Sequence, residues 1–223
     1  MLSCGNSNRE VPKNKLKLNM PTITESLHEI IKKQKELNYL FPLQGPANKN
    51  LINKVEKDLD LKFNDELNEL YSIGNGVSDS DSSVEVPELI PTYTFLDLEK
   101  AVSHYKARIG FQDSFLNSET NFRPNKKLFP FLEDGAGNYY WVDLNENSDN
   151  YSKIFWTNTF GDNPDYQYSS LTNFFNVIAE CYETNVITKD KEGYLRSDYI
   201  KYGQISQKYN PDLKYWNRYL NAK

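Results

Sequence analysis

The stretch LFPFLEDGAGNYYWVDL, residues 128–144, decides the fold, because two strand-forming runs flank the glycines Gly135 and Gly137. Glycine accepts a positive φ without a Cβ clash, so it suits the tight turn between two strands. In a nucleotide-binding loop the glycines would precede a helix, and a third glycine or Gly-Lys-Ser/Thr would follow. Here an aromatic, strand-like run follows. The stretch therefore predicts a β-hairpin whose glycines turn the chain.

Helical and strand patterns surround this hairpin on both sides. Helices are predicted at 23–38, 48–59, from Asn64 to the GNG at 74–76, from Asp97 to Gly110, and from Ser170, with shorter ones from Ser197 and from Asn210-Pro211. Further strands are predicted at 89–95 and 151–160. We therefore expect an α+β fold with leading helices, a mostly antiparallel or mixed sheet with packed helices, and an extra C-terminal helical segment.

The domain organisation is expected to have three parts. Residues 1–20 are polar and predict a flexible lead-in. Residues 21–184 hold the α+β domain, and residues 185–223 form a C-terminal helical extension packed on it. At 223 residues, the chain is within the range of one shared core.

The charge balance limits the class of partner. Lys and Arg number 26 against 31 Asp and Glu, giving a net charge of −5. This disfavours direct binding of nucleic acid, which needs a cationic surface. It suits a basic protein partner, although solubility alone also accounts for mild acidity.

The sequence holds no catalytic or metal-binding motif that we recognise. Neither His28 nor His104 has a second histidine or a cysteine at metal spacing. Asp143, Asn145 and Asn147 start like a calcium loop, but the loop lacks its turn glycine and its bidentate glutamate. We therefore expect no enzyme, no cofactor and no metal. A hydrolase that uses turn carboxylates is the lowest-ranked alternative, since it needs a cleft and a raised carboxylate pKa.

The alternation around Trp141 places Tyr140 and Val142 on one face of a strand and Tyr139, Trp141 and Asp143 on the other. One of these faces is a candidate for an exposed aromatic surface, which would suit a protein interface.

The sequence around each of the two cysteines predicts a different role for it. Cys181 falls in an apolar helical pattern and is expected in the core. Cys4 lies in MLSCGNSN, which resembles the end of a bacterial lipoprotein signal. The charged start and apolar stretch of such a signal are missing, so either the start was trimmed or the likeness is chance.

Four segments in order resemble the SUKH superfamily, which includes yeast cell-wall assembly regulators and bacterial immunity proteins that neutralise toxins. They are LINKVEKDLDLKFNDELNELYSIGNGV (51–77), ELIPTYTFLDLEKAV (88–102), LFPFLEDGAGNYYWVDL (128–144) and YQYSSLTNFFNVIAECYE (166–183). The likeness covers about residues 48–184. Phe63-Asn64 departs from the family's usual Leu-Pro, but Asn64 is a competent helix cap. The resemblance implies an α+β fold with a mixed sheet, no cofactor, a protein partner and no catalytic residue.

The leading hypothesis is an immunity protein that neutralises one specific toxin by direct binding. An effector that acts on nucleic acid carries a basic groove, which acidic turns would complement. The candidate partner-binding residues are Asp79, Asp81, Glu85 and Glu88 in the acidic loop at 77–88, and Glu133 and Asp134 in the hairpin. The other interpretation of each is a solvated loop charge.

The alternative from a different class is a scaffold or regulatory domain linked to the cell envelope. The sequence as given predicts a cytoplasmic protein. A missing upstream signal would instead make it a lipoprotein anchored through Cys4, which is the one route to a membrane that we expect. The oligomeric state is left open.

Overall fold

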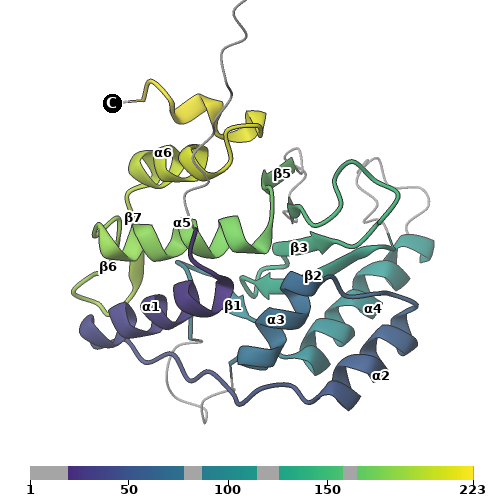
Figure 1. The fold of residues 1–223 in the computed structure, drawn as a ribbon. Helices are drawn as coiled ribbons and strands as arrows, with labels where there is room; N and C mark the ends of the chain where they lie inside the picture. Colours follow the sequence, from purple (N-terminus) through teal and green to yellow (C-terminus); the bar gives the residue numbers. More distant parts are fainter. Residues whose placement is uncertain (1–19, 78–86, 115–125, 158–164, 223) are drawn as a thin grey trace, which may run out of the picture.

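The computed structural model describes residues 20–77, 87–114, 126–157 and 165–222, and Figure 1 shows their arrangement. In these residues, helices pack against one antiparallel sheet, and a further helical segment lies beyond helix α5. The predicted α+β class is confirmed. The lead-in predicted at 1–20 lies outside the described residues except for Met20, and Cys4 lies outside them as well.

The three leading helices begin within a residue or two of their predicted starts. They are α1 (Ile23–Glu36), α2 (Lys49–Leu59) and α3 (Asp65–Ile73). Thr22 and Glu25 form a complete capping box on α1. Asn48 and Asn64 each accept a hydrogen bond from a backbone amide in the first turn of α2 and α3.

The sheet of the described residues has five strands that pair in chain order, each antiparallel to the next. They are β1 (Thr94–Phe95), β2 (Leu128–Glu133), β3 (Tyr139–Asp143), β4 (Ile154–Thr157) and β5 (Asp165–Tyr168). The β2–β3 hairpin is the one predicted at 128–144. Gly135 and Gly137 have φ of 73° and 94°, so both turn the chain as expected.

Two elements before the hairpin differ from the sequence expectation. The strand expected at 89–95 is reduced to two residues, because Ile90 and Tyr93 close a tight turn in which Thr92 has a φ of 73°. Helix α4 (Leu98–Ser114) runs through Gly110, so the prediction that this glycine ends the helix is wrong. A glycine inside a helix costs only about 1 kcal/mol, which packing elsewhere on the helix offsets.

The part after the sheet contains α5 (Leu171–Glu183), a hairpin of β6 (Ile187–Lys189) and β7 (Leu195–Ser197), α6 (Tyr199–Tyr209) and the 3₁₀ helix η1 (Lys214–Tyr219). The β6–β7 hairpin was not predicted. The cap of α6 is Asp198 and not Ser197, which already pairs with Ile187 in the ladder. Asn210-Pro211 makes a turn, and the predicted helix there begins later and is 3₁₀.

The core is continuous from the leading helices to η1. Helices α1 and α5 pack side by side, and the Ser26 hydroxyl donates to the Asn176 side chain across 150 residues of sequence. Phe174 of α5 contacts a set of rings: Phe131, Tyr140, Tyr168 and Phe175. Trp216 of η1 is 4% exposed and packs on Tyr168. The α5, α6 and η1 region therefore shares the core of the sheet.

Both faces of β3 are buried. Tyr140 and Val142 belong to the main core, whereas Tyr139 and Trp141 belong to a second aromatic cluster with Phe155. Trp141 is only 1% exposed. The predicted alternation is confirmed, but the expectation of an exposed aromatic surface on this strand is wrong.

Candidate functional site

A cleft of about 410 Å³ lies beside the β2–β3 turn, and it contains each of the candidate partner-binding residues that the structure describes. We call it the acidic cleft. Its described lining residues are Tyr39, Val77, Pro87, Glu88, Thr92, Thr94, Phe95, Leu96, Lys100, Glu133, Asp134, Gly135 and Tyr194. Glu88, Glu133 and Asp134 are thus brought together from two separate parts of the chain.

The other three candidates, Asp79, Asp81 and Glu85, lie outside the described residues. The segment that carries them nevertheless starts and ends at this cleft, since Val77 and Pro87 both line it. Residues 78–86 contain no Lys, Arg or His. Val77 and Pro87, which flank the acidic segment, therefore lie at the same cleft as Glu88, Glu133 and Asp134.

Glu88 is held in place through its backbone. Its amide donates to the Tyr39 hydroxyl over 3.0 Å, and its carbonyl accepts from Nε2 of Gln34 at 2.9 Å. Both partners come from α1 or the residues just after it. These two bonds fix the backbone of Glu88 at one wall of the cleft, where the residue is half-buried and its Oε2 is fully buried.

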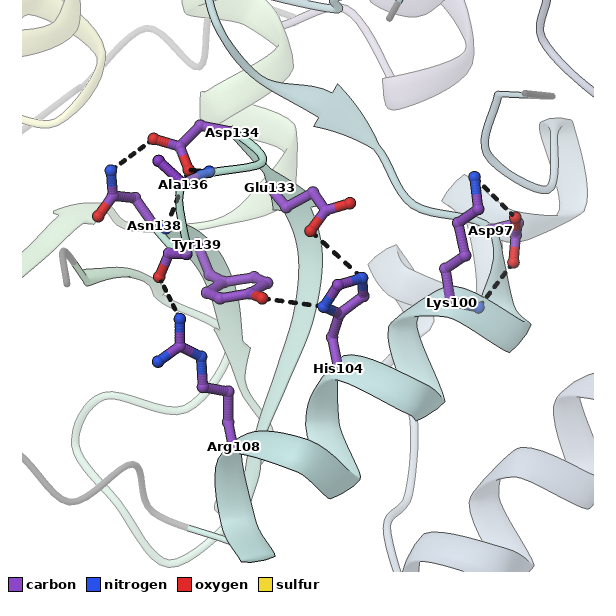
Figure 2. Close-up of polar contacts among 10 residues, drawn as sticks. Asp97, Lys100, His104, Arg108, Glu133, Asp134, Ala136, Asn138 and Tyr139 are labelled. Carbon is purple, nitrogen blue, oxygen red and sulfur yellow. Dashed lines mark hydrogen bonds and ion pairs between the residues drawn. The ribbon is translucent and has the colours of Figure 1, made fainter. Parts of the chain in front are cut away.

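Glu133, at the end of β2, lies against α4 (Figure 2). Its carboxylate is 3.2 Å from Nε2 of His104, whose Nδ1 is 2.9 Å from the Tyr139 hydroxyl. Burial raises the pKa of Tyr139, so the phenol stays protonated at neutral pH. In its Nε2–H tautomer, His104 donates to Glu133 and accepts from this phenol at Nδ1. This chain of contacts orients the carboxylate, and no sequence motif pointed to it.

The side chain of Asp134 stabilises the hairpin turn. Its Oδ1 accepts from the amides of Ala136 and Asn138, each at 2.9 Å (Figure 2). Arg108 of α4 donates to the Gly137 carbonyl at 2.8 Å and so ties the same turn to the helix. The turn that presents the cleft carboxylates is therefore fixed from within and from α4.

The described lining carries three carboxylates and one cation, Lys100. The Lys100 ammonium is 4.0 Å from the carboxylate of Asp97, the residue that caps α4. This proximity offsets part of its charge at the cleft. With three carboxylates against one lysine, the described lining of the cleft is negative on balance, which favours a cationic ligand.

The sequence profile of the SMI1 / KNR4 family (SUKH-1) matches residues 46–177, more than half of the chain. The chain belongs to this family. No curated protein matches the sequence at a significant level. The SUKH-1 match runs from just before α2 into α5, so it contains the whole five-stranded sheet and the described carboxylates of the acidic cleft. It leaves out α1, the β6–β7 hairpin, α6 and η1.

The described part of this SUKH-1 chain brings no three His, Cys, Asp or Glu side chains together in a way that could hold a metal ion. Asp143, the first residue of the calcium-like stretch, is 1% exposed and accepts from the Asn145 amide and the Tyr166 hydroxyl. It therefore serves the strand-connecting turn. His28 is exposed on α1. Among the described helices, none has the length and apolar character needed to cross a membrane.

Proposed function

We propose that this SUKH-1 protein is an immunity protein that neutralises one protein toxin by direct binding, without catalysis, through the acidic cleft. One observation carries the proposal: Glu88, Glu133 and Asp134 meet at one cleft, where the acidic segment 78–86 also begins and ends. A toxin that acts on nucleic acid needs a basic groove for phosphates. A negative cleft complements such a groove, speeds encounter and disfavours partners of the wrong charge.

The way in which the carboxylates are held supports binding of a rigid partner. Glu88 is fixed through its backbone, Glu133 through His104, and Asp134 through the turn amides. A preorganised surface loses little side-chain entropy on association. Within this arrangement Glu88 and Glu133 present charge, and Asp134 sets the shape of the turn that carries Glu133.

The test begins with an affinity pull-down from the native host, with the products of neighbouring genes included as candidate baits. A single stoichiometric partner that kills cells when expressed alone, and does not when this chain is present, is the expected result. The purified pair then allows the cleft to be tested. Glu88→Gln and Glu133→Gln together are expected to weaken binding about tenfold and to reduce its salt dependence. Glu29→Gln and Asp58→Asn, which remove exposed acids on α1 and α2, are the matched controls.

Two results would contradict the proposal in different ways. Equal affinity of the cleft variants and the control variants would remove the cleft from the interface while leaving the immunity role. Recovery of envelope proteins, with no toxin among them, would favour the scaffold alternative. In that case, membrane recovery that is lost on Cys4→Ala would support the lipid-anchored version.

A further inference from the structure

A second pocket, of about 220 Å³, adjoins the acidic cleft and is lined mainly by aromatic rings. We call it the aromatic pocket. Its described lining residues are Ile90, Pro91, Thr92, Tyr93, Tyr140, Trp156, Gln167, Ser197, Tyr199, Tyr202, Tyr215, Trp216 and Tyr219. Thr92 lines both cavities, so the turn that precedes β1 separates them. The two cavities are therefore neighbours on the molecule.

The aromatic pocket is built from two parts of the chain. Tyr93, Tyr140, Trp156 and Gln167 lie within the region that matches the SUKH-1 family, at 46–177. The tyrosines of α6 and η1, together with Trp216, lie outside it. The pocket is thus completed by a segment that lies outside the family match.

The rings on the sheet side are fixed by hydrogen bonds and by one another. The Trp156 indole donates to the Tyr93 hydroxyl over 2.7 Å, and the Tyr140 hydroxyl donates to Gln167 over 3.2 Å. The rings of Tyr93 and Tyr140 meet edge to face with centroids 4.9 Å apart. Tyr199 is 74% exposed and marks the open side. The pocket therefore has a rigid base and an accessible entrance.

The chemistry of this lining favours a cation. None of its described residues carries a formal charge, while the faces of aromatic rings attract cations through the ring quadrupole. Burial raises the pKa of Tyr93 to about 12, so its hydroxyl stays neutral at physiological pH. The ring of Tyr215 is already engaged by a cation of this chain, since the guanidinium carbon of Arg218 lies 4.1 Å from its centroid, so the other rings of the lining have to receive the ligand.

The size of the pocket restricts the ligand to a single side chain. Sites for drug-sized molecules measure about 300–1,000 Å³, which is larger than this pocket. Arginine fits the lining better than lysine, because its planar and weakly hydrated guanidinium stacks on aromatic rings. Arginine is also among the residues that dominate binding energy at protein interfaces.

We propose that the aromatic pocket receives one arginine side chain from a basic protein partner, while the acidic cleft binds the basic surface around that arginine. The identification of the partner as a toxin rests on the function proposed above. The recognition of arginine by the pocket stands on the ring geometry alone.

The test uses a peptide of six arginines and, as a neutral isostere, a peptide of six citrullines. The indole NMR resonances of Trp156 and Trp216 report binding in the aromatic pocket. The indole resonance of Trp141, in the other aromatic cluster, is the internal control. The arginine peptide is expected to shift the two pocket indoles, whereas the citrulline peptide leaves them unchanged.

Three variants distinguish the contribution of the tyrosine ring to peptide binding from that of its hydroxyl and from nonspecific effects of substitution. Tyr199→Leu is expected to weaken the arginine peptide about fivefold, the size of one partly exposed cation–π contact. Tyr199→Phe keeps the ring and should bind as the unchanged chain does. Tyr151→Leu removes another exposed tyrosine, outside both cavities, and should have no effect.

Equal binding of the two peptides, or shifts that do not respond to Tyr199→Leu, would overturn the proposal. Shifts of the pocket indoles by N,N′-diacetylchitobiose, with none by the arginine peptide, would overturn it in favour of a sugar site. The assay needs no toxin, so its failure is distinct from that of the proposed function. If the peptide binds the pocket and no toxin is recovered, arginine binding by the pocket is supported and the immunity function is contradicted.

Discussion

Gly203, in the middle of α6, provides a sharp test of how the C-terminal segment is packed. Helix propensity alone predicts that Gly203→Ala stabilises an α-helix by about 1 kcal/mol. The structure predicts the opposite sign, because a Cβ at this position would lie 2.2 Å from Cγ of Tyr219. Ordinary contact begins at 3.4 Å, so the Tyr219 ring has to retreat by at least 1.2 Å, the difference between the two distances.

The expected magnitude follows from that displacement. Overpacking of this kind costs about 1–3 kcal/mol, and the gain in propensity offsets only about 1 kcal/mol of it. We therefore expect a net loss of about 1 kcal/mol in the free energy of unfolding, which lowers Tm by about 2–4 °C for a chain of this size.

A double-mutant cycle with Tyr219→Ala isolates the contact. Without the ring, Gly203→Ala should stabilise the protein by about 1 kcal/mol, so the coupling between the two sites is about 2 kcal/mol. Urea unfolding of the four proteins, followed by tryptophan fluorescence, measures it. A rise in stability for Gly203→Ala with Tyr219 present, or additivity within about 0.5 kcal/mol, would refute the docking of η1 onto α6.

Three further predictions concern the cleft, the buried phenols and the buried thiol. Asp134→Ala should lower the free energy of unfolding by about 1–2 kcal/mol, because two turn amides lose their acceptor, whereas Asp134→Asn should cost less; urea unfolding checks both. Burial raises the pKa of Tyr93 from 10.0 to about 12, so its contribution to stability is complete below pH 10 and is lost as the pH rises toward 12; the ¹³Cζ NMR resonance of Tyr93 should therefore report a phenolate only together with unfolding. Burial also raises the pKa of the Cys181 thiol, so in a Cys4→Ala background it should react with Ellman's reagent only after unfolding.

Each of these has a distinct contrary outcome. Equal stability of Asp134→Ala and the unchanged chain would mean that its carboxylate does not hold the turn. A Tyr93 phenolate that forms near pH 10 while the fold persists would show that this side chain reaches solvent. Rapid labelling of Cys181 at neutral pH would place that thiol at the surface.

The hairpin and the helix starts could be predicted from sequence because their signals are local. Gly135 and Gly137 needed positive φ, and Thr22, Asn48 and Asn64 had side chains that satisfy amides at helix N-termini. The β6–β7 hairpin was missed because its strands have only three residues each and show no alternation long enough to recognise. Neighbouring Ser197 and Asp198 both suit a cap, and only pairing in the ladder decides between them.

The sequence allowed the individual acidic residues of the cleft to be predicted, but not that they would meet at one site. Glu133 and Asp134 were placed at the turn, and Glu88 in the acidic loop, from composition. Their meeting depends on the pairing of Thr94 with Glu133, which joins segments that local patterns cannot align. The aromatic pocket gave no signal, because its rings are scattered from Tyr93 to Tyr219 and converge only through long-range packing.

The pairing of α1 with α5 also has a consequence for synthesis of the protein. The strands of the sheet pair with their neighbours in sequence, so the sheet can form as it leaves the ribosome. The Ser26–Asn176 contact spans 150 residues, and at 5–20 residues per second α5 follows α1 by about 8–30 seconds. Throughout that interval the apolar face of α1, with Ile23, Leu27 and Ile30, lacks its main cover. Among the described elements, α1 is thus made first and completes its burial only once α5 has been made.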